Sequence, residues 1–200
     1  MKTNDNIENT GEMKGSEKQN GNTVDLAKLT FSVKNEDAKN LRITRSFLWL
    51  YIIMILVYSW LMVFDPDKDI TIIQRVSGLF YVASMVAFAL IFRKGYKEYK
   101  NIDYTLPIID MLKNAANRYR LKTRKFVELS IPILLMDVGL TLSFYHRMMP
   151  ESPIFRVLLI QAFYIPTMTL AGFIGYLKWH RKQKPLSDNA LKLIEELEGE

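Results

Sequence analysis

Apolar residues in this chain of 200 residues are gathered into four blocks, and charged residues fill the segments between them. The blocks cover residues 47–64, 70–92, 126–145 and 154–177. An α-helix needs roughly 17–25 predominantly apolar residues to cross the hydrocarbon core of a bilayer, and each block is about that long. The pattern therefore predicts an all-α membrane protein with four transmembrane helices.

The connections between the blocks alternate between short and long. Short turns over 65–69 and 146–153 would join the first block to the second and the third to the fourth, so the four spans form two in-out-in hairpins. Between the hairpins, the connection over 93–125 predicts an amphipathic helix from about Leu106 to Lys125 that continues into the third span. Thr105 is its expected N-cap, with Pro107 in the first turn. Its apolar stripe recurs at helical spacing at Ile109, Leu112, Ala116 and Tyr119, widened by Ile108, Met111 and Ala115.

The chain ends differ from the blocks in composition. Residues 1–23 are nearly free of apolar side chains, which predicts a disordered arm because too little surface can be buried to offset chain entropy. Residues 24–46 form a lead-in to the first span. Residues 178–200 form a tail in which Pro185 is expected to break the chain before a short helix, with Leu191, Ile194 and Leu197 on one face.

Basic residues are distributed unevenly among the connections. Eight Lys or Arg residues precede the first block, ten lie in 93–125 and five follow residue 177, whereas each short turn holds only one. Because loops rich in Lys and Arg stay on the cytoplasmic side, both termini and the central connection are predicted to be cytoplasmic. The formal net charge of +6 also favours an anionic membrane surface over an acidic substrate.

The basic connection over 93–125 has two main interpretations. Its cations contact either anionic lipid headgroups or a helix of a protein partner. Nucleic acid is not expected, because no recognisable nucleic-acid reading motif accompanies the charge. Oligomerisation stays open. The candidate contact residues are Lys113, Arg118, Arg120, Lys122, Arg124 and Lys125.

Polar residues inside the predicted spans are the other candidates, since an ionisable group in hydrocarbon needs a partner or an exit. Asp137 lies near the middle of its span and is too short to reach the interface. We hypothesise that it pairs with Arg75, braced by Gln161 or Tyr164. This group would be a polar clamp between helices or a proton or cation relay; alternatively, Asp137 is protonated and hydrogen-bonded by a neighbour.

Two further charged residues lie near the ends of the spans. Glu128 is close to the basic end of the third span and follows Arg124 by four residues, which predicts an interfacial helix pair between them. Arg156 lies near the start of the fourth span and is expected to extend its guanidinium outward to the interface.

Signatures of catalysis and of metal binding are missing from the sequence. The chain has no cysteine and only two histidines, so thiol chemistry is excluded and a histidine-rich metal site is implausible. No phosphate-binding loop, dinucleotide fingerprint or nucleophile elbow occurs. We therefore expect no enzyme activity, no metal and no cofactor.

Two stretches carry a resemblance to a known group. They are the helix Ile102-Asp-Tyr-Thr-Leu-Pro-Ile-Ile-Asp-Met-Leu-Lys113, followed by Ala116 and Arg118-Tyr-Arg120, and the patch Met136-Asp-Val-Gly-Leu-Thr-Leu142. In these stretches the chain resembles a group of uncharacterised small multi-span inner-membrane proteins of Bacteroidetes. The resemblance implies a location in a bacterial inner membrane and no known activity.

Two functional hypotheses follow from the sequence. The leading one is a non-enzymatic scaffold or regulatory partner that acts through its basic cytoplasmic connection, since the large connections are predicted to be cytoplasmic and the outer turns are short. The alternative is a small transporter or channel subunit that uses Asp137 and Arg75.

Overall fold

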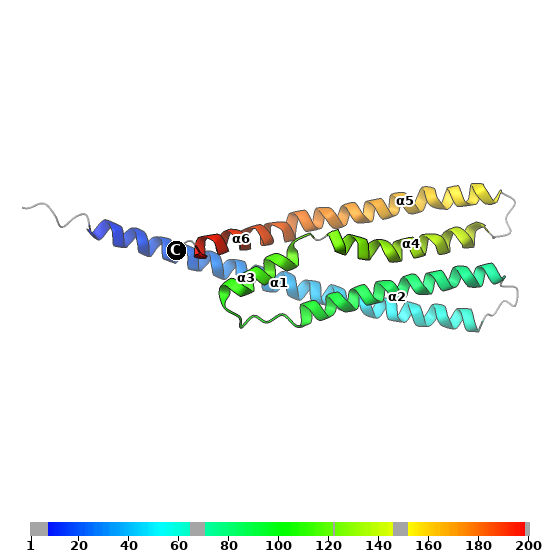
Figure 1. Cartoon of the computed structure of the whole chain (residues 1–200), viewed down its shortest axis with the longest axis horizontal. Helices are drawn as coiled ribbons and strands as arrows, with labels where there is room; N and C mark the ends of the chain where they lie inside the picture. The colour runs from blue at the N-terminus through cyan, green and yellow to red at the C-terminus, as the bar shows by residue number, and fades with distance from the viewer. Residues whose placement is uncertain (1–7, 65–70, 122, 146–151, 199–200) are drawn as a thin grey trace, which may run out of the picture. The chain divides into compact units, whose positions relative to one another are not determined.

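The structure is a computed structural model that describes residues 8–64, 71–121, 123–145 and 152–198. All regular structure in these residues is helical (Figure 1). The elements are α1 (Glu8–Val63), α2 (Ile72–Lys100), α3 (Ile108–Tyr119), α4 (Thr123–Tyr145), α5 (Pro153–Lys178), the π-helical turn η1 (Trp179–Gln183) and α6 (Lys184–Glu198). The predicted short turn over 65–69 and most of the one over 146–153 lie outside the described residues.

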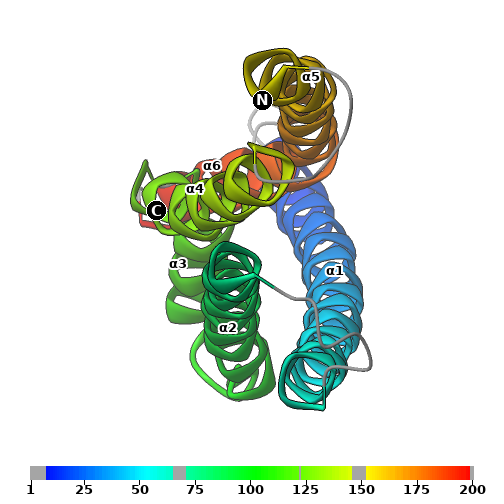
Figure 2. The ribbon, with the colours of Figure 1, turned by 90° about the vertical axis from the view of Figure 1, so that its right-hand side faces the viewer.

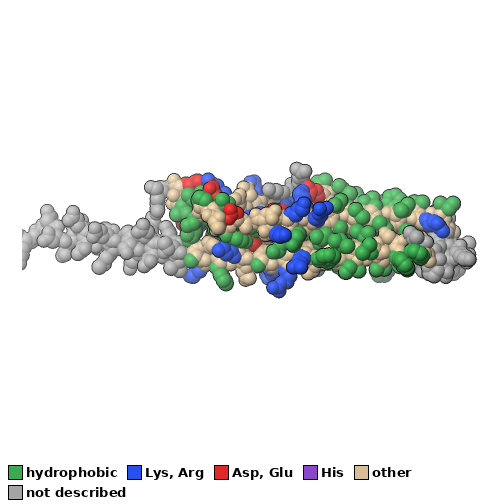
Figure 3. All heavy atoms as spheres, turned by 90° about the horizontal axis from the view of Figure 1, so that it is seen from below, with side chains coloured by type: hydrophobic (Ala, Val, Ile, Leu, Met, Phe, Trp, Pro, Cys, Tyr) green, Lys and Arg blue, Asp and Glu red, His purple; other side chains and the backbone are tan. Residues whose placement is uncertain are grey.

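Four segments are long and apolar enough to cross a membrane: Leu26–Met62, Ile72–Lys100, Lys125–Tyr145 and Pro153–Glu198. Large apolar side chains such as Leu56, Leu79 and Phe163 are exposed along them, each by more than 60%, and green side chains cover much of these helices in Figure 3. Water opposes such extensive apolar exposure on a single chain, whereas hydrocarbon accepts it. The predicted all-α architecture with four potential spanning helices is therefore confirmed.

Two spanning helices begin at caps that the sequence supplies. The Thr71 hydroxyl accepts a hydrogen bond from the backbone N–H of Gln74, and the Gln74 side chain accepts one from the backbone N–H of Thr71, which makes a capping box at the start of α2. Ser152 caps α5 by accepting from the N–H of Phe155, and Pro153 takes the first helical position. These caps provide partners for backbone N–H groups that the helix itself leaves unpaired.

The N-terminal segment differs from its prediction. Helix α1 begins at Glu8, so residues 8–23 of the predicted disordered arm are helical, while residues 1–7 lie outside the described part of the chain. The predicted lead-in over 24–46 belongs to the same helix. A helix that is already nucleated extends at small cost per residue, and this favours continuing the long apolar helix toward the N-terminus.

The connecting helix is shorter than predicted. Helix α3 ends at Tyr119 and α4 starts at Thr123, so the connection does not run on into the third span as one helix. Thr105 is not the N-cap either, because that position is held by Pro107 without a side-chain hydrogen bond. Instead, the carboxylate of Asp103 accepts hydrogen bonds from the backbone N–H and the hydroxyl of Thr105, at 2.8 and 2.6 Å. This local turn competes with the predicted cap.

The predicted break at Pro185 is also absent. Helices α5 and α6 are joined without interruption through η1, and Pro185 lies in the first turn of α6. Proline has no N–H and its ring crowds the carbonyl four residues earlier. The wider π turn at Trp179–Gln183 lies directly before it and accommodates both effects, so the chain stays helical.

The described chain belongs to two compact units. We call Met1–Ala38, Asp103–Arg120 and Lys182–Glu200 the accessory unit, and Lys39–Ile102 with Leu121–Arg181 the spanning unit. Helix α1 contributes residues to both. Within the spanning unit, Figure 2 shows α4 lying beside both α2 and α5.

Aromatic side chains join α1 to α2 in the spanning unit. Phe47 stacks on Phe92, and Tyr51 stacks on Phe88, with ring centroids 5.1 Å apart in each pair. As the residue number rises by four in α1, it falls by four in α2. The two helices are therefore antiparallel, with rings filling the space between them.

Small polar residues join α2 to α4. The buried Ser77 hydroxyl donates to the Gly139 carbonyl at 3.0 Å, and the buried Ser84 hydroxyl donates to the Pro132 carbonyl at 2.8 Å. The two contacts are seven residues apart on each antiparallel helix. The interface thus uses Ser77 and Ser84 on α2 and Gly139 on α4, and it lets the backbones approach closely.

Candidate functional site

The accessory unit has an apolar core made from three distant parts of the sequence. Helix α3 supplies five buried side chains, and α1 and α6 supply two each: Met111, Leu112, Ala115, Ala116 and Tyr119; Leu29 and Val33; Ala190 and Ile194. The apolar stripe predicted for the connecting helix therefore faces this core, with Ile109 packed at its edge and Ile108 exposed. The predicted stripe of the tail is wrong in part, because Leu191 is 48% exposed. Small Ala190 takes the core position and permits close packing of α6 against α3.

A carboxylate is buried at the edge of this core. Asp37 on α1 is only 2% exposed and accepts three hydrogen bonds from other segments. The donors are the Tyr119 hydroxyl at 2.7 Å, the Tyr104 hydroxyl at 3.0 Å and Arg118 Nη2 at 3.0 Å. We call these four residues the Asp37 cluster. A buried charge is tolerated when a countercharge and hydrogen bonds surround it, as they do here.

The Asp37 cluster changes the acid–base chemistry of one tyrosine. Burial, followed by the negative charge of Asp37 and its hydrogen bond, raises the pKa of Tyr104 from 10.0 to about 12. Both causes disfavour the phenolate. Tyr104 therefore remains a hydrogen-bond donor throughout the physiological pH range.

Sequence reasoning missed the Asp37 cluster. Asp37 continues the apolar series Leu29 and Val33 at four-residue spacing, which places the three on one helix face. An acid in line with a buried face needs a partner, and Arg118-Tyr119 lies on another amphipathic helix. An acid on a buried helix face, together with Arg118-Tyr119 on a second amphipathic helix, could therefore have indicated the Asp37 cluster.

The predicted basic contact residues lie in different environments. The Arg118 side chain is only 12% exposed and pairs with Asp37, so most of it is withdrawn from the surface. Lys113 pairs with Glu198 at 2.7 Å, and Glu198 raises the pKa of Lys113. Lys125 lies 3.9 Å from Glu98, and Arg120 is exposed at the C-cap of α3. Lys122 and the side chain of Arg124 lie outside the described residues.

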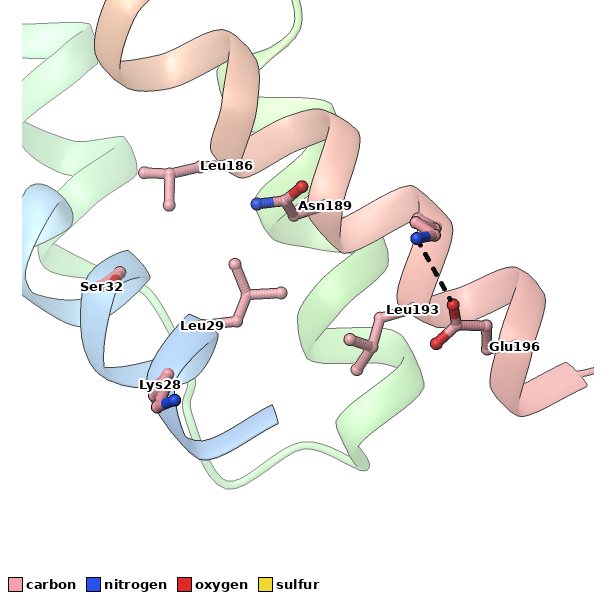
Figure 4. Close-up of a pocket in the computed structure, with 8 residues that line it drawn as sticks. Lys28, Leu29, Ser32, Leu186, Asn189, Leu193 and Glu196 are labelled. Carbon is pink, nitrogen blue, oxygen red and sulfur yellow. Dashed lines mark ion pairs between the residues drawn. The ribbon is translucent and has the colours of Figure 1, made fainter. Parts of the chain in front are cut away.

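A groove of about 400 Å³ lies between α1 and α6 in the accessory unit (Figure 4). Its apolar part is formed by Leu29, Leu186 and Leu193, which point into the space between the two helices. Polar and charged side chains complete the lining: Lys28, Ser32, Asn189, Lys192 and Glu196. Lys192 and Glu196 form a loose ion pair at 3.9 Å on the exposed side of α6. The lining is therefore more polar than apolar, with the three leucines as its apolar part.

The polar residues predicted inside the spans come together only in part. Gln161 donates to Asp137 at 2.5 Å and to the Thr141 hydroxyl at 3.1 Å, which links α5 to α4. Tyr164 donates instead to the Ile133 carbonyl at 2.8 Å. Arg75 is exposed and makes no ion pair with Asp137, so that predicted pair is wrong. Of the two predicted bracing residues, Gln161 is the one that donates a hydrogen bond to Asp137.

The two charges predicted near the span ends also have definite environments. Glu128 forms an ion pair with Lys94 at 2.8 Å. Arg156 does not extend outward: it is 8% exposed, and its Nε and Nη1 have no hydrogen-bond partner in the described part of the chain. Protein atoms therefore cover these two nitrogens.

Comparison with known protein families, with curated proteins and with solved structures found no match for this chain. The resemblance to the Bacteroidetes group therefore remains an expectation from the sequence. The functional argument rests on the accessory unit and the spanning unit themselves.

Proposed function

We propose that this chain is a multi-pass protein of a bacterial inner membrane that holds the accessory unit in the cytoplasm as a docking platform for a protein partner. The platform is a non-enzymatic scaffold or regulatory element. One observation carries the proposal: three segments separated by long apolar helices fold onto one another around a core of their own. The charge asymmetry supports a cytoplasmic location for that unit.

The groove between α1 and α6 is the docking surface that we propose. The basic connection alone is a poorer candidate, because Lys113 and Arg118 already have carboxylate partners within the unit. The groove offers apolar surface at Leu186 and Leu193, with Lys28 at its rim and Lys192 held only by a loose 3.9 Å pair with Glu196. These features suit an amphipathic helix of a partner protein with an apolar stripe and acidic flanks.

Site-specific photocrosslinking in native membranes tests the proposal. A photoreactive amino acid replaces Asn189 at the groove or Leu191 on the exposed side of the same helix. We expect one defined protein to crosslink from position 189 but not from 191. The substitution Leu193→Glu should abolish that crosslink, whereas Leu191→Glu should leave it. Equal crosslinking from both positions, or insensitivity to Leu193→Glu, would contradict the proposal.

A second candidate function is a small transporter or channel subunit. The contacts among Asp137, Gln161 and Thr141 favour it, because they gather three polar side chains inside the spanning unit. Ion or proton flux into vesicles that contain the purified chain, compared with Asp137→Asn, tests this candidate. A flux that survives Asp137→Asn unchanged would rule out Asp137 as the carrier group.

A further inference from the structure

A second groove, of about 270 Å³, lies between α2 and α4 in the spanning unit. Its walls are almost entirely apolar: Ala87, Leu90 and Ile91 on α2, and Ile131 and Pro132 on α4. Leu90 and Ile131 are both more than half exposed, so the groove opens to the outer surface of two helices that are apolar enough to span a membrane. In a bilayer that surface meets acyl chains.

The shape of the groove follows from the residues around it. Ser84 binds the Pro132 carbonyl and so draws the two helices together one turn away. Ala87 carries only a methyl group, and the proline ring is compact. They leave a hollow that larger side chains would have filled.

One end of the groove carries charge. Lys94 and Glu128 line it, and Lys94 Nζ lies 2.8 and 3.0 Å from the two oxygens of the Glu128 carboxylate. The Lys94 side chain is still 64% exposed, so its ammonium has donors available for another acceptor. Lys97 follows one turn later on α2 and is exposed. An apolar groove that ends in exposed cations matches a lipid that has an acyl chain and a negatively charged headgroup.

We propose that this groove binds one anionic phospholipid, with an acyl chain along Ala87, Leu90 and Ile131 and the phosphate at Lys94. In this arrangement Glu128 competes with the phosphate for Lys94. The lipid site shares no residue with the docking groove, so the lipid proposal can be tested separately from the proposed function.

Lipid retention measures this site directly. The full chain is reconstituted in nanodiscs that contain equal amounts of phosphatidylglycerol and phosphatidylcholine, extracted in mild detergent, and analysed by native mass spectrometry. We expect phosphatidylglycerol to remain bound in excess over phosphatidylcholine. Lys94→Gln should reduce its retention about fivefold, which corresponds to ~1 kcal/mol for one basic residue at an anionic surface. Lys178→Gln is the matched control, since Lys178 is exposed at the end of another spanning helix.

Further variants distinguish specific lipid binding in the groove from non-specific attraction to surface cations. Ala87→Leu fills the groove without changing charge and should also reduce retention, and Leu90→Trp at an exposed position repeats the test if Ala87→Leu fails to fold. Glu128→Gln should increase retention, because it releases Lys94. Equal effects of Lys94→Gln and Lys178→Gln, normal retention after the groove is filled, or equal retention of the two lipids would overturn the proposal.

Discussion

Asp37 on α1 and Asp137 on α4 have hydrogen-bond partners of different kinds. Asp37 is 2% exposed and has a guanidinium and two phenolic hydroxyls as partners. Asp137 is half-buried and contacts the side-chain amide of Gln161. A fully buried carboxylate needs a countercharge, whereas a partly exposed one can be satisfied by a neutral donor. The sequence-based interpretation assigned the countercharge to Asp137, but the structure gives it to Asp37.

The Asp37 cluster should dominate the stability of the accessory unit. Replacing Asp37 by Ala leaves Arg118 buried without its carboxylate, and we expect a loss of about 3 kcal/mol. Amide hydrogen exchange in detergent should show protection in α3 and α6 falling by roughly a hundredfold. The control is Glu98→Ala, which removes the exposed 3.9 Å pair with Lys125 and should cost less than ~0.5 kcal/mol. Similar losses in both variants would refute the assigned importance of the cluster.

Tyr104 contributes to folding stability in a pH-dependent way, and the sign of this contribution follows from its raised pKa. Its folded-state pKa is raised by burial and by Asp37, from 10.0 to about 12. The protonated form is thus favoured by folding, so its stabilisation is complete below pH 10 and is lost as the pH rises toward 12. The difference between tyrosinate absorbance titrations of the parent chain and Tyr104→Phe should show a group titrating near pH 12. Asp37→Asn should move that titration toward 10. Titration of Tyr104 near 10 in the parent chain would contradict the assignment.

At the scale of elements, a helix begins where the sequence predicts when a capping side chain is present. Without such a cap, the helix boundary depends on tertiary contacts. The boundaries at Thr71 and Ser152 follow from capping side chains. Small residues at helical spacing do not by themselves form the closest interface, since Ala83, Ala171 and Gly175 are exposed. Ser77 and Ser84 do so instead, because each can satisfy its hydroxyl on a carbonyl of α4.

Two helical glycines provide a matched test of the packing of α2 against α4. A Cβ atom at Gly139 would lie 2.9 Å from a ring carbon of Tyr81 and 3.2 Å from the Ser77 carbonyl oxygen. Gly139→Ala should therefore destabilise the chain by about 1–3 kcal/mol. No heavy atom lies within 4 Å of the corresponding position at Gly172, so Gly172→Ala should stabilise α5 by ~0.5–1 kcal/mol through reduced backbone entropy. Thermal unfolding in detergent measures both effects. If Gly139→Ala and Gly172→Ala changed the stability equally, the close approach of α2 and α4 at Gly139 would be contradicted.

At the scale of the whole molecule, charge sets the orientation that we propose. Lys and Arg residues are concentrated in the N-terminal segment, in 93–125 and in the tail, and these segments supply the whole accessory unit. Moving any of them across the bilayer would carry many cations with it.

The absence of cysteine makes this orientation directly testable. Single-cysteine variants at Asp67, in the segment predicted from the sequence to be the first short turn, and at Lys192, on α6, leave no background thiol. A membrane-impermeant maleimide should label the Asp67→Cys variant in intact cells and the Lys192→Cys variant only after permeabilisation. The reverse pattern, or labelling of both in intact cells, would invert or exclude the proposed topology.

The sequence by itself determined the spanning helices, the basic segments around them and the apolar stripe of α3. Each of these depends on residues close in the chain, whose composition and periodicity are visible without neighbours. Tertiary structure decided which faces meet. Asp37 finds partners 67 to 82 residues away, and Leu193 forms a groove with Leu29 across most of the chain. Such pairings depend on how three separated helices pack around one core, and no local pattern specifies that choice.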